Sequence, residues 1–258
     1  MSLSLEIGKN IYAKEFPPTY ELRPQVEKLS EFLRRGNNLF SEIDPIQFLV
    51  EQVYIQHHSN LPSENNVHKQ LIEKLAFDNE LELPRLYREF YYLLEGLFSR
   101  NKKLIDEAMP YLFEKLSAIA LESQYRCIAG NNRKFFIAGP PKSLRYEYYD
   151  MVEKKPRYKE EVDVVTVPKD GDDQHALGEC KTSVFGFTKS LQISYSFLEY
   201  LANIIEQSVQ RSVIIVFIFP TDASKIFNNL VSKISHKKTV FALSLVKWKE
   251  NPVAHKGK

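Results

Sequence analysis

The sequence is poor in cysteine and lacks any long apolar run. Its two cysteines, Cys127 and Cys180, do not make a disulfide framework, so we expect a reducing, cytoplasmic environment. No apolar stretch approaches the ~20 residues that a membrane-spanning helix needs. The longest, Val213–Phe219, has the length of a buried strand. The first residues also lack the charged start and apolar core of a signal peptide. We therefore expect no membrane association.

The sequence also lacks a strong excess of charge of either sign. The formal net charge is +2, which neither demands nor excludes nucleic acid as a partner, so the distribution of charge matters more than its total. A length of 258 residues suggests one or two domains with enough apolar residues to form a core. The composition therefore excludes secreted disulfide-rich and membrane-spanning proteins but does not select a function.

Charged residues instead gather at the ends of two short apolar segments. The first runs over Glu161–Val167 and the second over Ala176–Lys181, and a turn containing Asp170-Gly171 separates them. Such a turn predicts a β-hairpin, which would lay the two segments side by side. Because alternate residues of a strand share a face, Glu179 and Lys181 would point the same way and Cys180 the opposite way. We expect Asp163, Glu179 and Lys181 to meet at one point of the sheet.

Two carboxylates on a buried strand are costly unless they are paired or hold a metal. A divalent cation would remove their mutual repulsion, and Mg²⁺ prefers oxygen ligands and keeps waters for chemistry. Alternatively, Lys181 bridges Asp163 and Glu179 as an ion pair at the strand ends, because short acid-x-lysine strings are common. The spacing of these residues leaves both interpretations open.

The sequence resembles the catalytic core of the PD-(D/E)XK nuclease superfamily at Asp163 and, about fifteen residues later, at Glu179-Cys180-Lys181. Val162 stands where that motif often has proline. The expected order of elements after Leu104 is helix, three strands, helix, strand, helix, strand, and it is similar to the order in that superfamily. The resemblance covers about residues 104–247. It implies an α/β fold, with a mixed central sheet flanked by helices in a restriction endonuclease-like core, preceded by an all-α N-terminal region.

The resemblance also implies an enzyme, a Mg²⁺-dependent deoxyribonuclease in which Mn²⁺ can substitute. Asp163 and Glu179 would hold the metal, and the backbone carbonyl of Cys180 would add an oxygen ligand. Lys181 would orient or activate the attacking water and stabilise the transition state. A glutamate on the helix before the first core strand often completes such sites, and this role falls to Glu114, which would hold a second metal or a water.

Glu114 is chosen over Glu122 because of the neighbours on its helical face. Glu114 shares a face with Ala118 and Leu121, an apolar stripe that should face the sheet. Glu122 shares its face with Lys115 and is expected to face solvent. The alternative is that Glu114 merely lies at the edge of a buried stripe.

Basic residues before and after the two acids are candidates for contact with DNA. The turn before Glu161, itself a possible accessory acid, would carry four of them, and its alternative is a solvated turn. The helix after Lys181 begins with two weaker candidates. The six nucleic-acid candidates are Lys154, Lys155, Arg157, Lys159, Lys189 and Gln192.

The rest of the chain divides at about residue 103. We expect a helical N-terminal region over 1–103, for DNA recognition, a cleft wall or a dimer contact, and the nuclease core with a basic C-terminal tail over 104–258. Residues 1 to about 18 are expected to be irregular and residues 182–189 to form a loop. The helix from Leu104 to Tyr125 is expected to break or restart at Pro110.

Together these features predict a metal-dependent endonuclease acting on DNA, such as a restriction endonuclease, which would be a homodimer in order to cut both strands. The alternatives are a repair or recombination nuclease, and a nuclease-fold protein that binds nucleic acid or another protein without cutting.

Overall fold

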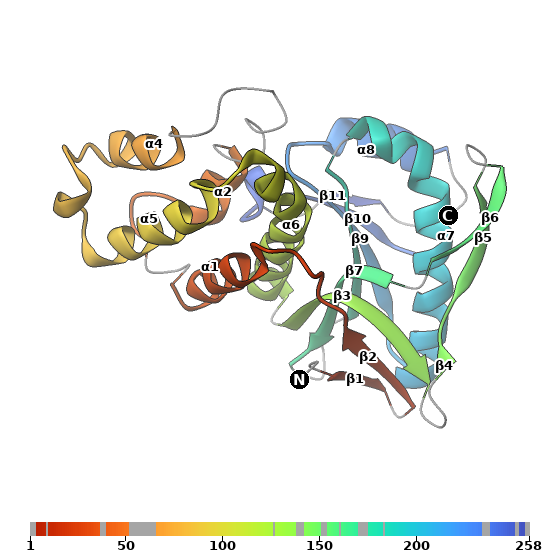
Figure 1. Cartoon of the computed structure of the whole chain (residues 1–258). Coiled ribbons are helices and arrows are strands. Elements are labelled where there is room, and N and C mark those ends of the chain that lie inside the picture. Colours follow the sequence, from red (N-terminus) through yellow and green to blue (C-terminus); the bar gives the residue numbers. More distant parts are fainter. Residues whose placement is uncertain are drawn as a thin grey trace.

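The computed structural model is a mixed α/β protein in which helices flank a central sheet and further helices lie to one side of it (Figure 1). The expected mixed central sheet flanked by helices is therefore confirmed, but the N-terminal region is not all-α, because Ser4–Gly8 and Ile11–Glu15 are strands of that sheet. The structure describes residues 4–8, 10–36, 40–51, 66–125, 127–137, 142–150, 154–159, 161–169, 175–182, 184–233, 238–250 and 253–255.

The central sheet has nine strands, and their order is β1-β2-β3-β7-β8-β9-β10-β11, with β4 paired to β3. The remaining two strands, β5 and β6, form a separate antiparallel ribbon. The strands are β1 (Ser4–Gly8), β2 (Ile11–Glu15), β3 (Cys127–Ile137), β4 (Lys142–Ser143), β5 (Tyr146–Asp150), β6 (Lys155–Lys159), β7 (Glu161–Pro168), β8 (His175–Cys180), β9 (Val213–Phe219), β10 (Val240–Ser244) and β11 (Val253–His255).

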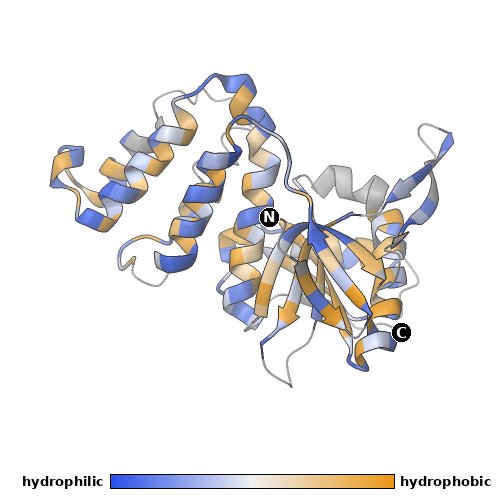
Figure 2. Cartoon of the chain, turned by 60° about the horizontal axis from the view of Figure 1, so that its bottom comes forward, coloured by the Kyte–Doolittle hydropathy of each residue, from blue (hydrophilic) through white to orange (hydrophobic). Residues whose placement is uncertain are grey.

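The helices cover the sheet on both faces. The α-helices are α1 (Arg23–Gly36), α2 (Pro45–Leu49), α4 (Asn66–Leu75), α5 (Arg85–Phe98), α6 (Lys102–Tyr125), α7 (Val184–Val209) and α8 (Ser224–Val231), and the 3₁₀ helices are η3 (Glu80–Glu82) and η4 (Leu245–Lys247). Helix α6 contacts β3, β7 and β8, and α1 and α5 pack beyond it. Helices α7 and α8 lie over the other face (Figure 1). Apolar residues concentrate on the strands enclosed between these layers (Figure 2).

The middle of the sheet explains this layering. Every residue of β9 is buried, as expected for an apolar strand with helices on both sides. It pairs in parallel with both β8 and β10, which confirms the expected strand–helix–strand arrangement. Strands β7 and β8 pair antiparallel, Val164 opposite Gly178, as the Asp170-Gly171 turn predicts.

Three local expectations are wrong. Residues 4–15 are not an irregular lead-in, because β1 and β2 form an antiparallel hairpin that pairs with β3. Residues 182–189 are not a loop, because α7 already begins at Val184. Glycine at 186 costs only about 1 kcal/mol in a helix, which the cooperative extension of a long helix offsets. The basic turn is largely strand β6.

Helix α6 continues through Pro110 without the expected break. Proline removes the hydrogen bond to the carbonyl four residues earlier, which belongs to Asp106. Both Pro110 and Asp106 are exposed, so water can satisfy that carbonyl while the buried face of the helix holds its course.

Among the helices that the structure describes, none has the length and apolar character needed to span a membrane. Both cysteines are free thiols, Cys127 buried and Cys180 half-buried.

Candidate functional site

Strands β7 and β8 bring Asp163 and Glu179 together at adjoining positions. Val164 pairs with Gly178, so Asp163 and Glu179 come next along the same ladder. The backbone N–H of Cys180 donates to Asp163 Oδ2 over 2.7 Å, which fixes the Asp163 carboxylate beside the end of β8. The expected meeting of the two acids is therefore present in the structure.

Glu179 is buried at 3% exposure and receives three donors on one oxygen. Its Oε1 accepts from Lys159 Nζ, from Lys181 Nζ at 2.8 Å and from Ser194 Oγ at 3.2 Å. Its other oxygen, Oε2, is buried without a hydrogen-bond partner among the described residues. Burial alone would raise the pKa of Glu179, but Lys159 and Lys181 outweigh it and lower that pKa below its usual value.

Asp163 lies in a less favourable field. Burial and then the negative charge of Glu179 raise the pKa of Asp163 to about 7, against the opposing effect of Lys159 and the N–H of Cys180. An additional positive charge beside Asp163 would stabilise its ionised carboxylate and lower its pKa.

Glu114 approaches the same point from α6. Its Oε2 accepts from Asn132 Nδ2 over 2.7 Å, and its backbone carbonyl accepts from Asn131 Nδ2 over 2.7 Å. Asn131 Nδ2 also reaches the backbone carbonyl of Asp163 at 3.3 Å, which ties α6 to β7 through β3. Burial and then the charge of Asp163 raise the pKa of Glu114 to about 9. The expectation that Glu114 faces the sheet is correct.

Asn132 adopts a left-handed backbone conformation, with φ of 47°. Asparagine tolerates this region better than most residues. The conformation interrupts the regular alternation of β3, so that Asn131 and Asn132 both contact Glu114.

Cys180 points away from Glu179, as the strand period requires. Its Sγ lies 3.4 Å from Ser117 Oγ on α6, whereas Glu179 contacts Ser194 on α7. Burial raises the pKa of the Cys180 thiol well above its usual value, so it remains a neutral packing group. Within the described residues, no group of three or more His, Cys, Asp or Glu side chains is arranged to hold a metal ion.

The basic candidates are divided between the ribbon and α7. Lys154 and Lys155 are exposed, Arg157 is half-buried, and Lys159 reaches back to Glu179 instead of remaining on the outside of a turn. Gln192 is exposed on α7. Lys189 lies in α7, but its side chain is outside the described residues. Glu161 is half-buried at the start of β7, opposite Lys134 of β3.

Four side chains at this site were not anticipated in these roles. Asn131 and Asn132 hold Glu114, Ser194 donates to Glu179, and Lys159 neutralises Glu179. Ser194 lies outside the apolar stripe that Leu191, Tyr195, Leu198 and Ala202 form on α7, yet it is buried at 2% exposure. The only sequence signal for it was that Ser194 is a small polar residue in the helix that follows the acid-x-lysine string.

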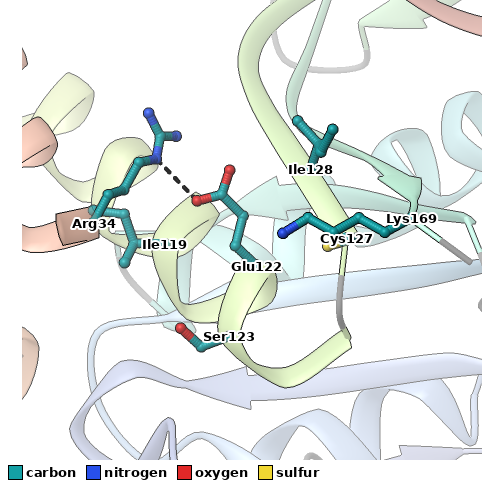
Figure 3. A pocket seen from close by; sticks show the side chains of 7 residues that line it. All are labelled: Arg34, Ile119, Glu122, Ser123, Cys127, Ile128 and Lys169. Carbon is teal, nitrogen blue, oxygen red and sulfur yellow. Dashed lines mark hydrogen bonds and ion pairs between the residues drawn. The ribbon is translucent and has the colours of Figure 1, made fainter. Parts of the chain in front are cut away.

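A separate pocket of about 250 Å³ lies at the C-terminal end of α6 (Figure 3). Arg34 Nε donates to Glu122 Oε2 over 2.9 Å at its wall, and Glu122 also accepts from the N–H of Ala129. Glu122 is thus half-buried and paired, so the expectation that it faces solvent is wrong. The lining residues are Arg34, Ile119, Glu122, Ser123, Cys127, Ile128 and Lys169.

No family model and no curated protein matches this chain. Among solved structures, this chain matches the crystal structure of protein VC1899 from Vibrio cholerae with a TM-score of 0.35 and 12% sequence identity. The match covers 93% of this chain, which spans 56% of that chain.

Proposed function

We propose that this protein is a metal-dependent endonuclease that hydrolyses phosphodiester bonds of DNA in the cytoplasm. The observation that carries the proposal is the convergence of Asp163, Glu179 and Lys181 at one end of β7 and β8, with Glu114 approaching from α6. These are the residues through which the sequence resembles the PD-(D/E)XK nucleases. Acids on neighbouring strands with a lysine two residues after the second suit metal-assisted attack on a phosphate.

The donor set fits a hard divalent cation. Glu179 Oε2 is a buried carboxylate oxygen with no partner among the described residues. Burial and then the charge of Glu179 raise the pKa of Asp163 beside it. Mg²⁺ is commonly held by one or two carboxylates together with waters and substrate phosphates. A described set of three acidic side chains is therefore not required. Asp163, Glu179 and the backbone carbonyl of Cys180 would hold Mg²⁺, or Mn²⁺ in its place.

When bound, the metal would polarise a phosphoryl oxygen and lower the pKa of a coordinated water. The chain's own residues supply the remaining functions. Lys181 Nζ, 2.8 Å from Glu179 Oε1, would orient the attacking water and stabilise the additional negative charge of the transition state. Lys159, held on the same oxygen, would add a second positive charge near the phosphate. Glu114 would hold a water or a second metal.

The test is plasmid cleavage by purified variants. Asp163→Ala and Lys181→Ala should each reduce nicking of supercoiled DNA by about a hundredfold or more, as loss of a central electrostatic group typically does. Exposed residues provide matched controls, Asp78→Ala for the acid and Lys225→Ala for the lysine. Circular dichroism spectra that match the wild type would show that folding is intact. Unchanged nicking by either site variant would refute the proposed function.

A second candidate is a protein of the same fold that binds nucleic acid without cutting it. It is favoured by the two ammonium groups on Glu179 Oε1, because they already neutralise that carboxylate without a metal. Incubation of the wild-type protein with supercoiled, linear and single-stranded DNA, and with RNA, in Mg²⁺ or Mn²⁺ would decide between the two. Mapped double-strand cuts at fixed sequences would support a restriction endonuclease, for which we propose a homodimer testable by sedimentation. Structure-dependent nicks would support a repair or recombination nuclease.

A further inference from the structure

A strip of aromatic and basic side chains lies on β2 and β3, outside the acid cluster. Tyr12, Lys14 and Phe16 alternate along the chain of β2 and the residue after it, so they share one face of the sheet. Ala13, which points to the opposite face, is fully buried at 0% exposure. This face, which is half-buried at Tyr12 and Lys14 and exposed at Phe16, therefore carries ring, cation and ring in succession.

Strand β3 continues this pattern sideways. Phe136 lies opposite Tyr12, and Lys134 lies opposite Lys14. The rings of Tyr12 and Phe136 are stacked with centroids 5.5 Å apart, and Phe16 lies 6.2 Å from Phe136. We call these five residues, Tyr12, Lys14, Phe16, Lys134 and Phe136, the aromatic strip.

Packing within the sheet accounts for only part of the strip. Cross-strand aromatic pairs stabilise antiparallel strands, which explains the contact of Tyr12 with Phe136. Phe16 lies one residue beyond the end of β2 and remains 43% exposed. A large ring held in water beside two other rings and two cations has the composition of a surface that binds a ligand.

The strip leads directly to the acid cluster. The N–H of Phe16 donates to the backbone carbonyl of Asn132 over 2.9 Å, and the side chain of Asn132 donates to Glu114 over 2.7 Å. Tyr20 lies four residues after Phe16. Burial and then the negative charge of Glu114 raise the pKa of Tyr20, so Tyr20 lies near that acid. Asn132 therefore links the Phe16 end of the strip to Glu114.

We propose that the aromatic strip is a stacking platform for single-stranded nucleic acid that delivers the unpaired strand to the acid cluster. This inference rests on the proposed nuclease function and names its substrate class. Every base has a π-face, so aromatic rings bind single strands with little dependence on sequence. Bases within a duplex already stack on one another and cannot offer these faces, so the platform favours unpaired strands or splayed ends.

The two lysines of the strip supply charge complementarity to such a strand. Lys14 Nζ lies 5.7 Å from the centroids of both Tyr12 and Phe136, and Lys134 Nζ lies 4.9 Å from that of Phe16. An exposed cation–π contact is weaker than the stacking of a base, so a base can displace either ammonium group. The long lysine stem then lets the ammonium reach a phosphate. Glu161 lies opposite Lys134 on β7, so we expect Lys14 to make the stronger phosphate contact.

The test is binding of a fluorescein-labelled oligothymidine at low salt in EDTA, measured by anisotropy, so that cleavage cannot interfere. Phe16→Ala should weaken binding at least about fivefold, the lower range for loss of one stacked base. Tyr92→Ala is the matched control, because Tyr92 is an aromatic residue of α5 with 48% exposure, and its affinity should equal that of the wild type. Equal affinity of Phe16→Ala and the wild type would overturn the proposal.

A second variant reports the contact itself. Phe16→Trp keeps a stacking ring, so it should bind as tightly as the wild type, and its fluorescence should be quenched as the oligonucleotide is added. The natural Trp248 is buried at 4% exposure and should contribute little to that change. Binding of the oligonucleotide without quenching of the fluorescence of Phe16→Trp would overturn the stacking contact.

The two proposals can fail separately. If the wild-type protein cuts duplex DNA but Phe16→Ala binds single strands as tightly as the wild type, the proposal of a stacking platform is wrong and the proposed nuclease function is retained. If the oligonucleotide binds and the Phe16 variants respond as expected while no substrate is cut, the proposal of a stacking platform is retained and the proposed nuclease function is wrong. Competition by an unlabelled duplex should be at least about fivefold weaker than by an unlabelled single strand of the same length, and equal competition would overturn the preference for unpaired strands.

Discussion

Replacing Glu114 by glutamine should make the stability of the protein less dependent on pH. Burial and the charge of Asp163 raise the pKa of Glu114 from 4.5 to about 9, so the folded state keeps a proton that the unfolded chain releases. Below the unfolded pKa both states are protonated and the two proteins should behave alike. As pH rises from there toward the folded pKa, the wild type should lose free energy of unfolding, and Glu114→Gln should lose less, because only the raised pKa of Asp163 still contributes in the variant.

The magnitude follows from the linkage of protonation to folding. One proton retained in the folded state corresponds to a slope of at most about 1.4 kcal/mol per pH unit. The hydrogen bond from Asn132 opposes the shift, which narrows the pH range of the effect without changing its slope. Near either pKa only part of a proton is retained, so an average of about 1 kcal/mol per pH unit is expected across the range. Glutamine can accept the same bond from Asn132, so the substitution removes the titration and keeps the contact.

The assay is urea unfolding in EDTA at several values between about pH 5.5 and pH 8, where the folded and unfolded proton counts differ most. The difference in free energy of unfolding between variant and wild type should grow steadily with pH. Glu107→Gln, an exposed acid on the same helix, controls for the loss of one negative charge. Parallel profiles for the wild type and Glu114→Gln would refute the view that Glu114 is protonated beside Asp163.

Two further predictions concern lysines. Lys159→Met removes one of the two ammonium groups on Glu179 Oε1, so calorimetry should show that Mn²⁺ binds about tenfold more tightly. Lys225→Met is the control. An unchanged affinity for Mn²⁺ in Lys159→Met would contradict competition between Lys159 and the metal. Lys115→Met should destabilise the protein by about 3 kcal/mol in urea unfolding, because Glu15 at 3.3 Å and Glu27 at 3.4 Å would lose their buried partner. Adding Glu15→Gln should recover part of that loss, and if it recovers none the ion pair does not account for the effect.

Much of the fold could be predicted because its signals are local. The alternating period of a strand and the Asp170-Gly171 turn sufficed to bring Asp163 beside Glu179. The apolar stripe of α7 and the apolar run of β9 likewise specified their own structures. The position of Glu114 followed from the side of α6 on which its apolar neighbours lie.

Contacts between distant elements could not be predicted in the same way. Lys159 reaches Glu179 only because the ribbon of β5 and β6 folds back along α7, which no spacing in the sequence reveals. The left-handed conformation of Asn132 accompanies its contacts with Glu114 and Phe16, and the presence of an asparagine in a strand does not predict it. The hairpin of β1 and β2 was missed because its strands are short and because β2 pairs with β3, more than a hundred residues away.

The balance of charge at the acid cluster bears on the choice between an ion pair and a metal site. Lys159 and Lys181 both bind the same oxygen of Glu179, so an ion pair explains that oxygen. It leaves the second, buried oxygen of Glu179 unused and Asp163 with a raised pKa. Without a metal, the two lysines balance Asp163 and Glu179 only while Glu114 keeps its proton.

A divalent cation would change this balance in a direction that suits a nucleic acid. It would favour ionisation of Glu114, so that three carboxylates would face two ammonium groups and the metal, leaving one positive charge. A phosphodiester carries one negative charge and would complete the balance. On the proposed function, the protonated Glu114 therefore keeps the site neutral before metal and substrate arrive. The pH dependence expected for Glu114→Gln should accordingly diminish when Mg²⁺ is added, and a dependence that Mg²⁺ leaves unchanged would argue for the ion pair.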